Sequence, residues 1–229
     1  MNLKKVNEEV YDINLKLSKS HLVIQNFGNA SSRYKESFVI KPSGIDLNTH
    51  NFNDMVQVDF SGHVINGKLK PSSDEPTHRI LYKENADIGG IIHTHSKFAS
   101  AFAQANTPIE NLGTTHSDFS KNKIFVTNQL SEKQVLDDYE LNTGIKILEK
   151  FEEEKIELIE SPGILSIRHG VFAWGKSIEE ALKNAEIIEY LAEMAFYTKV
   201  INPNSKSIES YISKKHYFRK HGPDSYYGQ

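Results

Sequence analysis

Three histidines in this sequence stand where a protein could hold a metal ion. His93 and His95 are two residues apart at the end of the apolar run Ile88–Ile92, and His169 follows a second apolar run, Ile164–Ile167. Residues i and i+2 of a strand share a face, so the first pair can offer two imidazoles to one cation. Three histidines at strand ends could form an open site with positions left for substrate oxygens. From spacing alone, the alternative that they are plain polar residues at strand ends stays open.

A carboxylate and several small polar residues are further candidates. Asp74 could be a fourth metal ligand or a close neighbour of the metal, although local sequence alone favours the alternative that it is the N-cap of a following helix. The pairs Gly28-Asn29, Ser43-Gly44 and Ser72-Ser73 could present backbone N–H groups and hydroxyls to an anion. Each pair alone is also typical of an ordinary turn. The pairs indicate an anion-binding site only if all three lie close together in the folded chain.

The composition limits the kind of protein that can carry these residues. The chain has 229 residues, a formal net charge of −3 and no cysteine, so any metal must be bound by His, Asp or Glu. No basic excess is present for binding along a nucleic acid, and no apolar run is long enough to span a membrane. Charged residues within positions 1–11 argue against a signal peptide. We therefore expect one cytoplasmic domain over residues 1–229, without nucleic-acid or membrane partners.

The spacing of apolar residues predicts the elements that must position the candidate residues. Helices are predicted at residues 3–18, 75–83, 98–105, 131–154 and 178–192, the last opened by a capping box of Ser177 and Glu180. Strands are predicted at residues 38–40, 56–60, 64–65, 88–95, 124–126 and 164–167. Hairpin signals lie beside helix-connected strands, which favours an α/β domain with a mixed or largely antiparallel sheet covered by helices.

Six short motifs follow one another along the chain. They are Gly-Asn-Ala-Ser at 28–31, Ile-Lys-Pro-Ser-Gly at 40–44, Pro-Ser-Ser-Asp-Glu-Pro-Thr-His at 71–78, Gly-Ile-Ile-His-Thr-His-Ser at 90–96, Gly-Thr-Thr-His-Ser-Asp at 113–118 and His-Gly-Val-Phe-Ala-Trp-Gly at 169–175. In this order they resemble the class II aldolase family. The C-terminal run at 215–229 is similar to the tail of the pentulose-phosphate epimerases within that family, so the resemblance spans nearly the whole chain.

The resemblance implies a three-layer α/β/α fold with a mainly antiparallel sheet, and a homotetramer with active sites between subunits. It implies one divalent metal per subunit, most naturally Zn²⁺ with Mn²⁺ or Co²⁺ as alternatives, held by Asp74, His93, His95 and His169. It assigns substrate binding to Gly28, Asn29, Ser43, Gly44, Ser72 and Ser73. It assigns acid and base catalysis to Asp118 and Tyr227, the latter in a tail of about residues 206–229. Val171 departs from the family, which usually has proline there.

Some residues near these motifs have no settled role. Lys41 could add positive charge beside the phosphate-binding positions, or it could be a solvated lysine on a strand. His116 is expected to orient the loop that carries Asp118, and His216 could reach a site from a neighbouring subunit.

The chemistry of such an epimerase agrees with the residue types. In a ketopentose 5-phosphate with its carbonyl at C2, the hydrogen on C4 is not α to the carbonyl, so proton exchange cannot invert C4. Cleavage of C3–C4 instead leaves an enediolate that a metal can stabilise, and the aldehyde fragment can turn and add back through its other face.

Two rival functions come from the same resemblance. A class II sugar-phosphate aldolase would release the aldehyde fragment, but in the aldolases that resemble fuculose-phosphate aldolase a glutamate usually stands at the position of Asp74. A non-catalytic domain similar to the adducin head would be expected to lack the three metal histidines, and this sequence has them.

Overall fold

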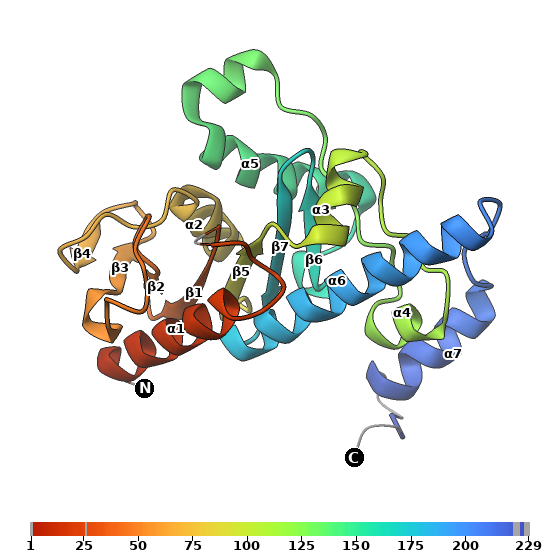
Figure 1. Ribbon diagram of the computed structural model, residues 1–229, viewed down its shortest axis with the longest axis horizontal. Helices are drawn as coiled ribbons and strands as arrows, with labels where there is room; N and C mark the ends of the chain where they lie inside the picture. Colours follow the sequence, from red (N-terminus) through yellow and green to blue (C-terminus); the bar gives the residue numbers. More distant parts are fainter. Residues whose placement is uncertain (1, 26, 222–224, 227–229) are drawn as a thin grey trace.

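A computed structural model describes residues 2–25, 27–221 and 225–226 of the chain. A seven-stranded sheet in the order β4-β3-β2-β1-β5-β7-β6 forms its centre, and every neighbouring pair of strands is antiparallel (Figure 1). The strands are β1 (Gly28–Tyr34), β2 (Ser37–Ile40), β3 (Val56–Asp59), β4 (Val64–Asn66), β5 (Gly90–Thr94), β6 (Gly163–Ser166) and β7 (Gly170–Gly175). The predicted mainly antiparallel α/β fold is therefore confirmed.

Helices cover both faces of the sheet. They are α1 (Leu3–Ser18), α2 (Glu75–Glu84), α3 (Lys97–Gln104), α4 (Thr114–Phe119), α5 (Glu132–Glu154), α6 (Ile178–Ile201) and α7 (Ser210–His221), with short 3-10 turns η1 (Phe52–Asp54) and η2 (Leu158–Glu160). One face is covered by α1, α3 and α6 and the other by α2 and α5, which makes three layers. Helices α4 and α7 pack together beside one end of α6 (Figure 1).

Two hydrophobic cores, one on each face, follow from the alternation of side chains along the strands. Ile92 of β5 packs among residues of α1 and α6, whereas the preceding Ile91 packs among residues of α2 and α5. Val39 of β2 lies in the first core and its neighbour Phe38 in the second. Successive side chains of a strand point to opposite faces of the sheet. Because both faces are covered by helices, these central strands are continuous apolar runs and do not alternate between apolar and polar residues.

Most predicted elements are present with bounds within a few residues of those expected. The run at 124–126 is an exception, because it forms isolated bridges and not a strand. Ile124 pairs with Ile109, but the backbone of Phe125 and Thr127 pairs with Leu165 on another segment, so no continuous ladder develops. The capping box at α6 is also incomplete. Ser177 caps the helix, while the carboxylate of Glu180 accepts from the N–H of Lys176.

Two strands, β1 and β7, and two helices, α4 and α7, were not predicted. Strand β1 reads Gly-Asn-Ala-Ser-Ser-Arg-Tyr, which lacks the apolar pattern of a strand, yet it lies between β2 and β5 in the centre of the sheet. Helix α7 lies within the predicted tail segment. Among the described residues, no helix has the length and apolar character needed to cross a membrane.

Candidate active site

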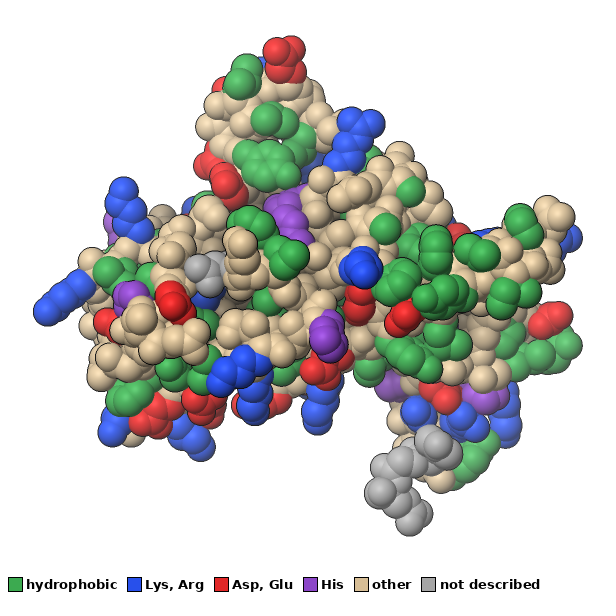
Figure 2. All heavy atoms as spheres, in the orientation of Figure 1, with side chains coloured by type: hydrophobic (Ala, Val, Ile, Leu, Met, Phe, Trp, Pro, Cys, Tyr) green, Lys and Arg blue, Asp and Glu red, His purple; other side chains and the backbone are tan. Residues whose placement is uncertain are grey.

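A cavity of about 320 Å³ brings together the predicted metal and substrate-binding residues. It is lined by Phe27, Gly28, Asn29, Lys41, Ser43, Gly44, Ser72, Ser73, Asp74, His93, His95, Tyr139, Glu140 and His169. Figure 2 shows histidine side chains reaching the surface at the base of the projection formed by α5. Segments from six separate parts of the chain thus meet at one place, which the sequence could only suggest.

The antiparallel pairing of β5 and β7 places the three histidines side by side. Thr94 pairs with Val171, so the chain just after β5 lies beside the turn that leads into β7. The ring centres of the three histidines are 4.7–4.9 Å apart, and one possible ligand atom of each lies within 4.8 Å of the others. Arg168 adopts a left-handed φ of 57° in the turn before His169, which allows the chain to reverse there.

The hydrogen bonding of these histidines suits a cation. His93 Nδ1 lies 2.9 Å from the carbonyl oxygen of Val171 and donates to it, which leaves the lone pair on Nε2 free. That Nε2 is 3.1 Å from Nε2 of His95, so two acceptor lone pairs would face each other unless a proton or cation lay between them. Burial lowers the pKa of His95, and it lowers the pKa of His169 to about 3, which favours uncharged rings that can each offer one nitrogen lone pair. The donor set therefore fits a divalent metal of the kind that imidazole binds.

Asp74 is directed into the cavity and does not cap its helix. It occupies the N-cap position of α2, but its side chain makes no capping hydrogen bond. Its Oδ2 accepts instead from Nδ2 of Asn29 at 2.7 Å. Burial alone raises the pKa of Asp74, but the neighbouring histidines, above all His93, and the Asn29 bond together lower it below its usual value. The alternative that this carboxylate serves as a helix cap is wrong.

The predicted anion-binding segments form one wall of the cavity. The N–H of Ser72 donates to the carbonyl of Lys41, and Pro42 pairs with Pro71, so two loops far apart in sequence are joined. Gly44 has a φ of +66°, and open space lies where a side chain would be. Gly28 has a φ of +131°, and a Cβ there would lie 2.9 Å from the carbonyl oxygen of His93. Both glycines are therefore required by the backbone.

Lys41 is buried, with 5% of its surface exposed, and it lines the cavity. Burial lowers its pKa, while the nearby carboxylate of Asp74 raises it. A solvated lysine on a strand, the alternative left open by the sequence, is therefore wrong. The side chain brings positive charge to the wall formed by the serines and glycines.

Three cavity residues, Phe27, Tyr139 and Glu140, were missed by sequence reasoning. Tyr139 and Glu140 follow Asp138, whose extended backbone (φ −162°, ψ 91°) kinks α5. The ring of Tyr139 is 5.7 Å from that of His169, centre to centre. The predicted helix was continuous, and its apolar spacing carries no signal of this kink. Only the structure shows that this turn of α5 faces the histidines.

Asp118, a predicted acid/base residue, does not line this cavity. It lies on α4 and contacts α7, where Nδ1 of His216 is 3.0 Å from its Oδ1 and Arg219 donates through Nε at 3.0 Å and Nη2 at 2.6 Å. Burial raises the pKa of Asp118, but the hydrogen bonds from Arg219 and His216 outweigh this and lower it. His116 bonds through Nε2 to the carbonyl of Asn122 at 2.9 Å, within the same loop. Tyr227 lies outside the described residues.

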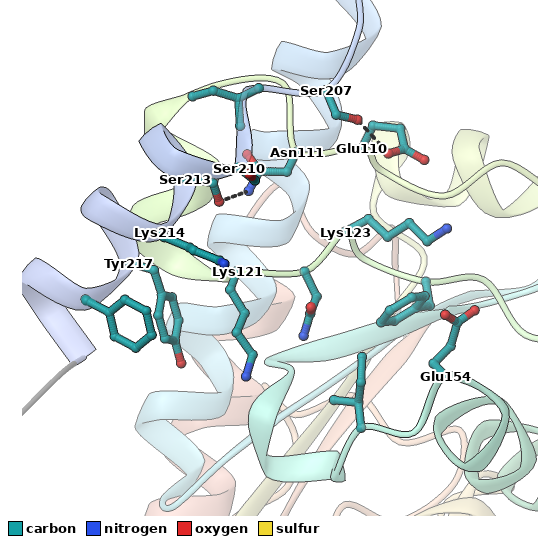
Figure 3. Close-up of a pocket in the computed structure, with 15 residues that line it drawn as sticks. Glu110, Asn111, Lys121, Lys123, Glu154, Ser207, Ser210, Ser213, Lys214 and Tyr217 are labelled. Atoms are coloured by element: carbon teal, nitrogen blue, oxygen red, sulfur yellow. Dashed lines mark hydrogen bonds between the residues drawn. The ribbon is translucent and has the colours of Figure 1, made fainter.

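A second cavity, of about 780 Å³, lies between α7 and residues 121–125 (Figure 3). It is lined by lysines, small polar residues and aromatic rings, including the labelled Lys121, Lys123, Lys214 and Tyr217. The amine of Lys121 is paired with Glu160 at 2.7 Å. No histidine lines this cavity among the residues that the structure describes. We therefore place the site at the histidines, although that cavity is smaller.

Buried imidazoles make the metal-free protein sensitive to acid. Burial lowers the pKa of His78 and of His169 to about 3, from 6.5 for an exposed imidazole. Between these values the unfolded chain binds protons that the folded chain does not, so the free energy of unfolding should fall as the pH drops from 6.5 towards 3. Each histidine should contribute a slope of about 1.4 kcal/mol per pH unit. Urea unfolding of the metal-free protein at several pH values in this range measures the effect. We expect the free energy of unfolding of His78→Gln to change less steeply with pH. An equal free energy of unfolding at every pH would contradict the prediction.

Comparison with known proteins shows similarity along the whole chain. The family profile of the class II aldolase and adducin N-terminal domain matches residues 8–196. The chain is 44% identical over 229 residues to L-ribulose-5-phosphate 4-epimerase UlaF of Salmonella paratyphi A (strain ATCC 9150 / SARB42), and the match covers 99% of this chain and 100% of that protein. The protein of the same name from Salmonella typhi is equally similar, with the same identity and coverage.

Solved structures agree with the fold. A structure of L-fuculose 1-phosphate aldolase superposes with a TM-score of 0.78 at 22% identity, covering 94% of this chain and 96% of that one. The L-fuculose-1-phosphate aldolase of Thermus thermophilus superposes with a TM-score of 0.68 at 19% identity, covering 88% of this chain and 99% of that one. At these identities the likeness concerns the arrangement of helices and strands and not the substrate.

Proposed function

The chain belongs to the class II aldolase and adducin N-terminal domain family, and from that membership we propose that it is an L-ribulose-5-phosphate 4-epimerase. It is an isomerase, and it interconverts L-ribulose 5-phosphate and D-xylulose 5-phosphate. The observation that carries the proposal is the 44% identity with epimerases of this name over the full length of both chains. The cavity supports it with residues suited to a metal, a phosphate and a sugar.

The rival functions fit these observations less well. Asp74 stands where the aldolases of this family usually have glutamate, and its carboxylate contacts Asn29 inside the cavity. A domain with only a binding role would have no need of three histidines whose ligand atoms lie within 4.8 Å of one another. Both features favour the epimerase.

We propose that His93, His95 and His169, with Asp74, hold one divalent metal per subunit, and that this metal is Zn²⁺. Bound there, it would act as a Lewis acid that stabilises the negative charge developing on the C2 and C3 oxygens when C3–C4 breaks. Imidazole nitrogens also bind Mn²⁺ and Co²⁺, so metal analysis of the purified protein identifies the native ion.

The chain's own residues have three tasks in this reaction. A base removes the proton from the C4 hydroxyl as the C3–C4 electrons move to C3, which gives glycolaldehyde phosphate and an enediolate. The phosphate then has to be held while the aldehyde turns, and the wall of Asn29, Ser43, Ser72 and Ser73 supports this role. Addition through the opposite aldehyde face, with protonation of the C4 oxygen by an acid, completes inversion.

We propose that Asp118 and Tyr227 supply these acid and base groups from a neighbouring subunit of a homotetramer. Asp118 does not line the cavity of its own chain, and this supports a role in the active site of a neighbouring subunit. Figure 2 shows hydrophobic side chains gathered over α6, and an exposed apolar patch of this kind favours association. The patch includes Tyr190, Met194, Tyr197, Val200 and Ile201.

We further propose that the enzyme works in the cytoplasm, in the breakdown of pentoses. Arabinose breakdown and L-xylulose 5-phosphate from other sugars are the two candidate sources of substrate. Rates with both L-pentulose 5-phosphates distinguish these sources.

Replacing Lys41 should weaken binding of the phosphate. A charged hydrogen bond of about 1.5–3 kcal/mol corresponds to a rise in KM of roughly 10- to 100-fold in Lys41→Met. Lys70→Met is a matched control, because Lys70 is exposed and only its backbone joins the same pair of loops. Steady-state kinetics on both variants make the comparison. An unchanged KM in Lys41→Met would exclude a role in binding.

The proposal is tested by incubating the metal-loaded protein with L-ribulose 5-phosphate and identifying the products. We expect D-xylulose 5-phosphate, with no net release of glycolaldehyde phosphate. Accumulation of the aldehyde would support the aldolase, and no turnover with a full complement of metal would exclude both enzymes for this substrate.

A further inference from the structure

A carboxylate on α6 binds the first turn of the helix that follows His95. Glu189 is partly buried, and the backbone N–H of Phe98 donates to its Oε1 and that of Ala99 to its Oε2, both at 2.9 Å. Phe98 and Ala99 are the second and third residues of α3, where N–H groups have no partner within their own helix. Both bonds are charge-assisted, and a negative charge at this end of a helix is favoured by the helix dipole.

Helix α3 takes this cap from a distant element although a local one is at hand. Ser96 is its N-cap residue, and a serine hydroxyl at that position ordinarily accepts from the same N–H groups. Here Ser96 makes no capping bond, and its Oγ is buried with no hydrogen-bond partner among the described residues. Glu189 lies 90 and 91 residues further along the chain than the two donors. A local cap would stabilise α3 alone, whereas this one also attaches α3 to α6.

Aromatic packing adds a second contact between the same two helices. The ring of Phe98 lies 5.7 Å from that of Phe196 and 6.0 Å from that of Tyr197, centre to centre. Both partners are about two turns beyond Glu189 on α6. Helix α6 also packs on β5 and β7, and Figure 1 shows α3 beside it. The strands that lead to His93 and from His169 thus share one support with α3.

His95 has few contacts of its own that fix its position. Strand β5 ends at Thr94, and only His95 and Ser96 lie between it and α3. Among the described residues, the backbone of His95 makes no hydrogen bond, and its ring has a polar contact only with Nε2 of His93, at 3.1 Å. His93 differs, because its ring is also bonded to a backbone carbonyl. The position of His95 therefore depends on β5 before it and on α3 after it.

The other end of α3 bonds the turn that carries His169. The backbone N–H of Arg168 donates to the carbonyl of Ala103, in the last turn of α3, at 3.0 Å. Helix α3 thus begins two residues after one proposed ligand and ends at the turn of another. The ring centres of His95 and His169 are 4.9 Å apart, so a movement of α3 would change the spacing of the ligand set.

We propose that Glu189 is a positioning residue of the metal site. Its carboxylate fixes α3 against α6, and α3 in turn sets the position of His95 relative to the other two histidines. Glu189 does not line the cavity, so it acts only through the backbone of α3. The inference rests on the proposed metal-dependent function, because it concerns the spacing of the proposed ligands.

Two substitutions of Glu189 remove the contact by different amounts. Glu189→Ala removes both acceptor oxygens. Glu189→Gln keeps one carbonyl oxygen and places an NH₂ group against the second backbone N–H, so one bond is lost. Both variants leave the proposed metal ligands unchanged.

Two control variants separate the proposed role from charge and from helix stability. Glu186→Gln makes the same change one turn earlier on α6, at an exposed residue with no hydrogen bond or ion pair among the described residues. Asn2→Ala removes the cap of α1, where the Asn2 side chain accepts from the N–H of Lys5 at 2.9 Å. Helix α1 carries no proposed site residue, so Asn2→Ala lowers stability without changing the ligand set.

The test is the affinity for Zn²⁺, measured by competition with a chelator, together with the visible spectrum of the Co²⁺ protein. We expect Glu189→Ala to lose roughly 10-fold or more in affinity and to change the Co²⁺ spectrum, as for other groups that orient metal ligands. Glu189→Gln should show a smaller loss in the same direction. Glu186→Gln and Asn2→Ala should keep the affinity and spectrum of the unsubstituted protein, although Asn2→Ala unfolds at a lower urea concentration.

Affinities and spectra of the Glu189 variants equal to those of the controls would overturn the proposal. If Glu189→Ala does not fold, the comparison of Glu189→Gln with Glu186→Gln decides by the same criterion. The unsubstituted protein separates this result from the proposed function, because failure of that protein to bind Zn²⁺ would refute the metal site itself and the inference with it. No substrate is present, so the outcome of the epimerase assay does not affect the result.

Discussion

Replacement of His93 or of His95 by asparagine is expected to remove bound metal and epimerase activity while the chain stays folded. The shorter amide cannot reach the position of Nε2, where the two rings face each other at 3.1 Å. Loss of several kcal/mol of charge stabilisation corresponds to roughly 1,000-fold or more in rate. Metal content by mass spectrometry and turnover under saturating substrate provide the measurement.

His21→Asn is the control for this result, since that histidine is exposed and does not line the cavity. It should keep full metal content and activity. His95 is itself exposed, so its replacement should change the stability of the metal-free protein little. Full metal occupancy in both His93→Asn and His95→Asn would show that the site has been assigned wrongly.

Mixing two inactive variants should restore activity if each site is shared between subunits. His95→Asn lacks a proposed metal ligand and Asp118→Asn lacks a proposed acid/base group, and a mixed ring would combine the intact half of each. In a closed ring with random assembly from equal amounts, about one quarter of the interfaces would carry an intact site. Activity is measured before and after subunit exchange, which is followed by native mass spectrometry.

Asp118→Asn also changes contacts with α7, where His216 and Arg219 bind the carboxylate. Tyr227→Phe is therefore mixed with His95→Asn in parallel, since it removes only a hydroxyl. Recovery in both mixtures is the expected outcome. Verified exchange without recovered activity would mean that these residues act within their own chain or not at all.

The parts of the site that depend on short sequence patterns could be predicted. The spacing of His93 and His95 on an apolar strand determined that they share a face, and the structure places His169 beside them. The metal role of the set, and the substrate role of the glycines and serines, came from the resemblance to a family. Those residues do line one cavity, but their roles stay predictions until the variants are measured.

The sequence failed where polar side chains are satisfied by distant partners. Strand β1 was missed because Asn29 and Ser31 are polar, and their partners Asp74 and His78 are more than 40 residues away. Apolar periodicity cannot detect a strand whose inner face is hydrogen-bonded to a helix. The same polar residues that prevented prediction of this strand, Asn29 and Ser31, bond Asp74 and His78 beside the site.

Backbone irregularity explains two further differences. The extended conformation of Asp138 interrupts α5 and turns Tyr139 towards His169, and nothing in the apolar spacing marks that break. The buried run at 124–126 exchanges one pairing partner for another instead of forming a ladder. Both features depend on tertiary packing, which overrides local preference.

The central claim is that C4 is inverted by breaking and remaking the C3–C4 bond, with the hydrogen on C4 never removed. The most direct test uses L-ribulose 5-phosphate deuterated at C4, incubated with the metal-loaded enzyme in ordinary water. We predict D-xylulose 5-phosphate that retains its deuterium at C4, as observed by NMR and mass spectrometry. Loss of deuterium to solvent from C4 would contradict the account.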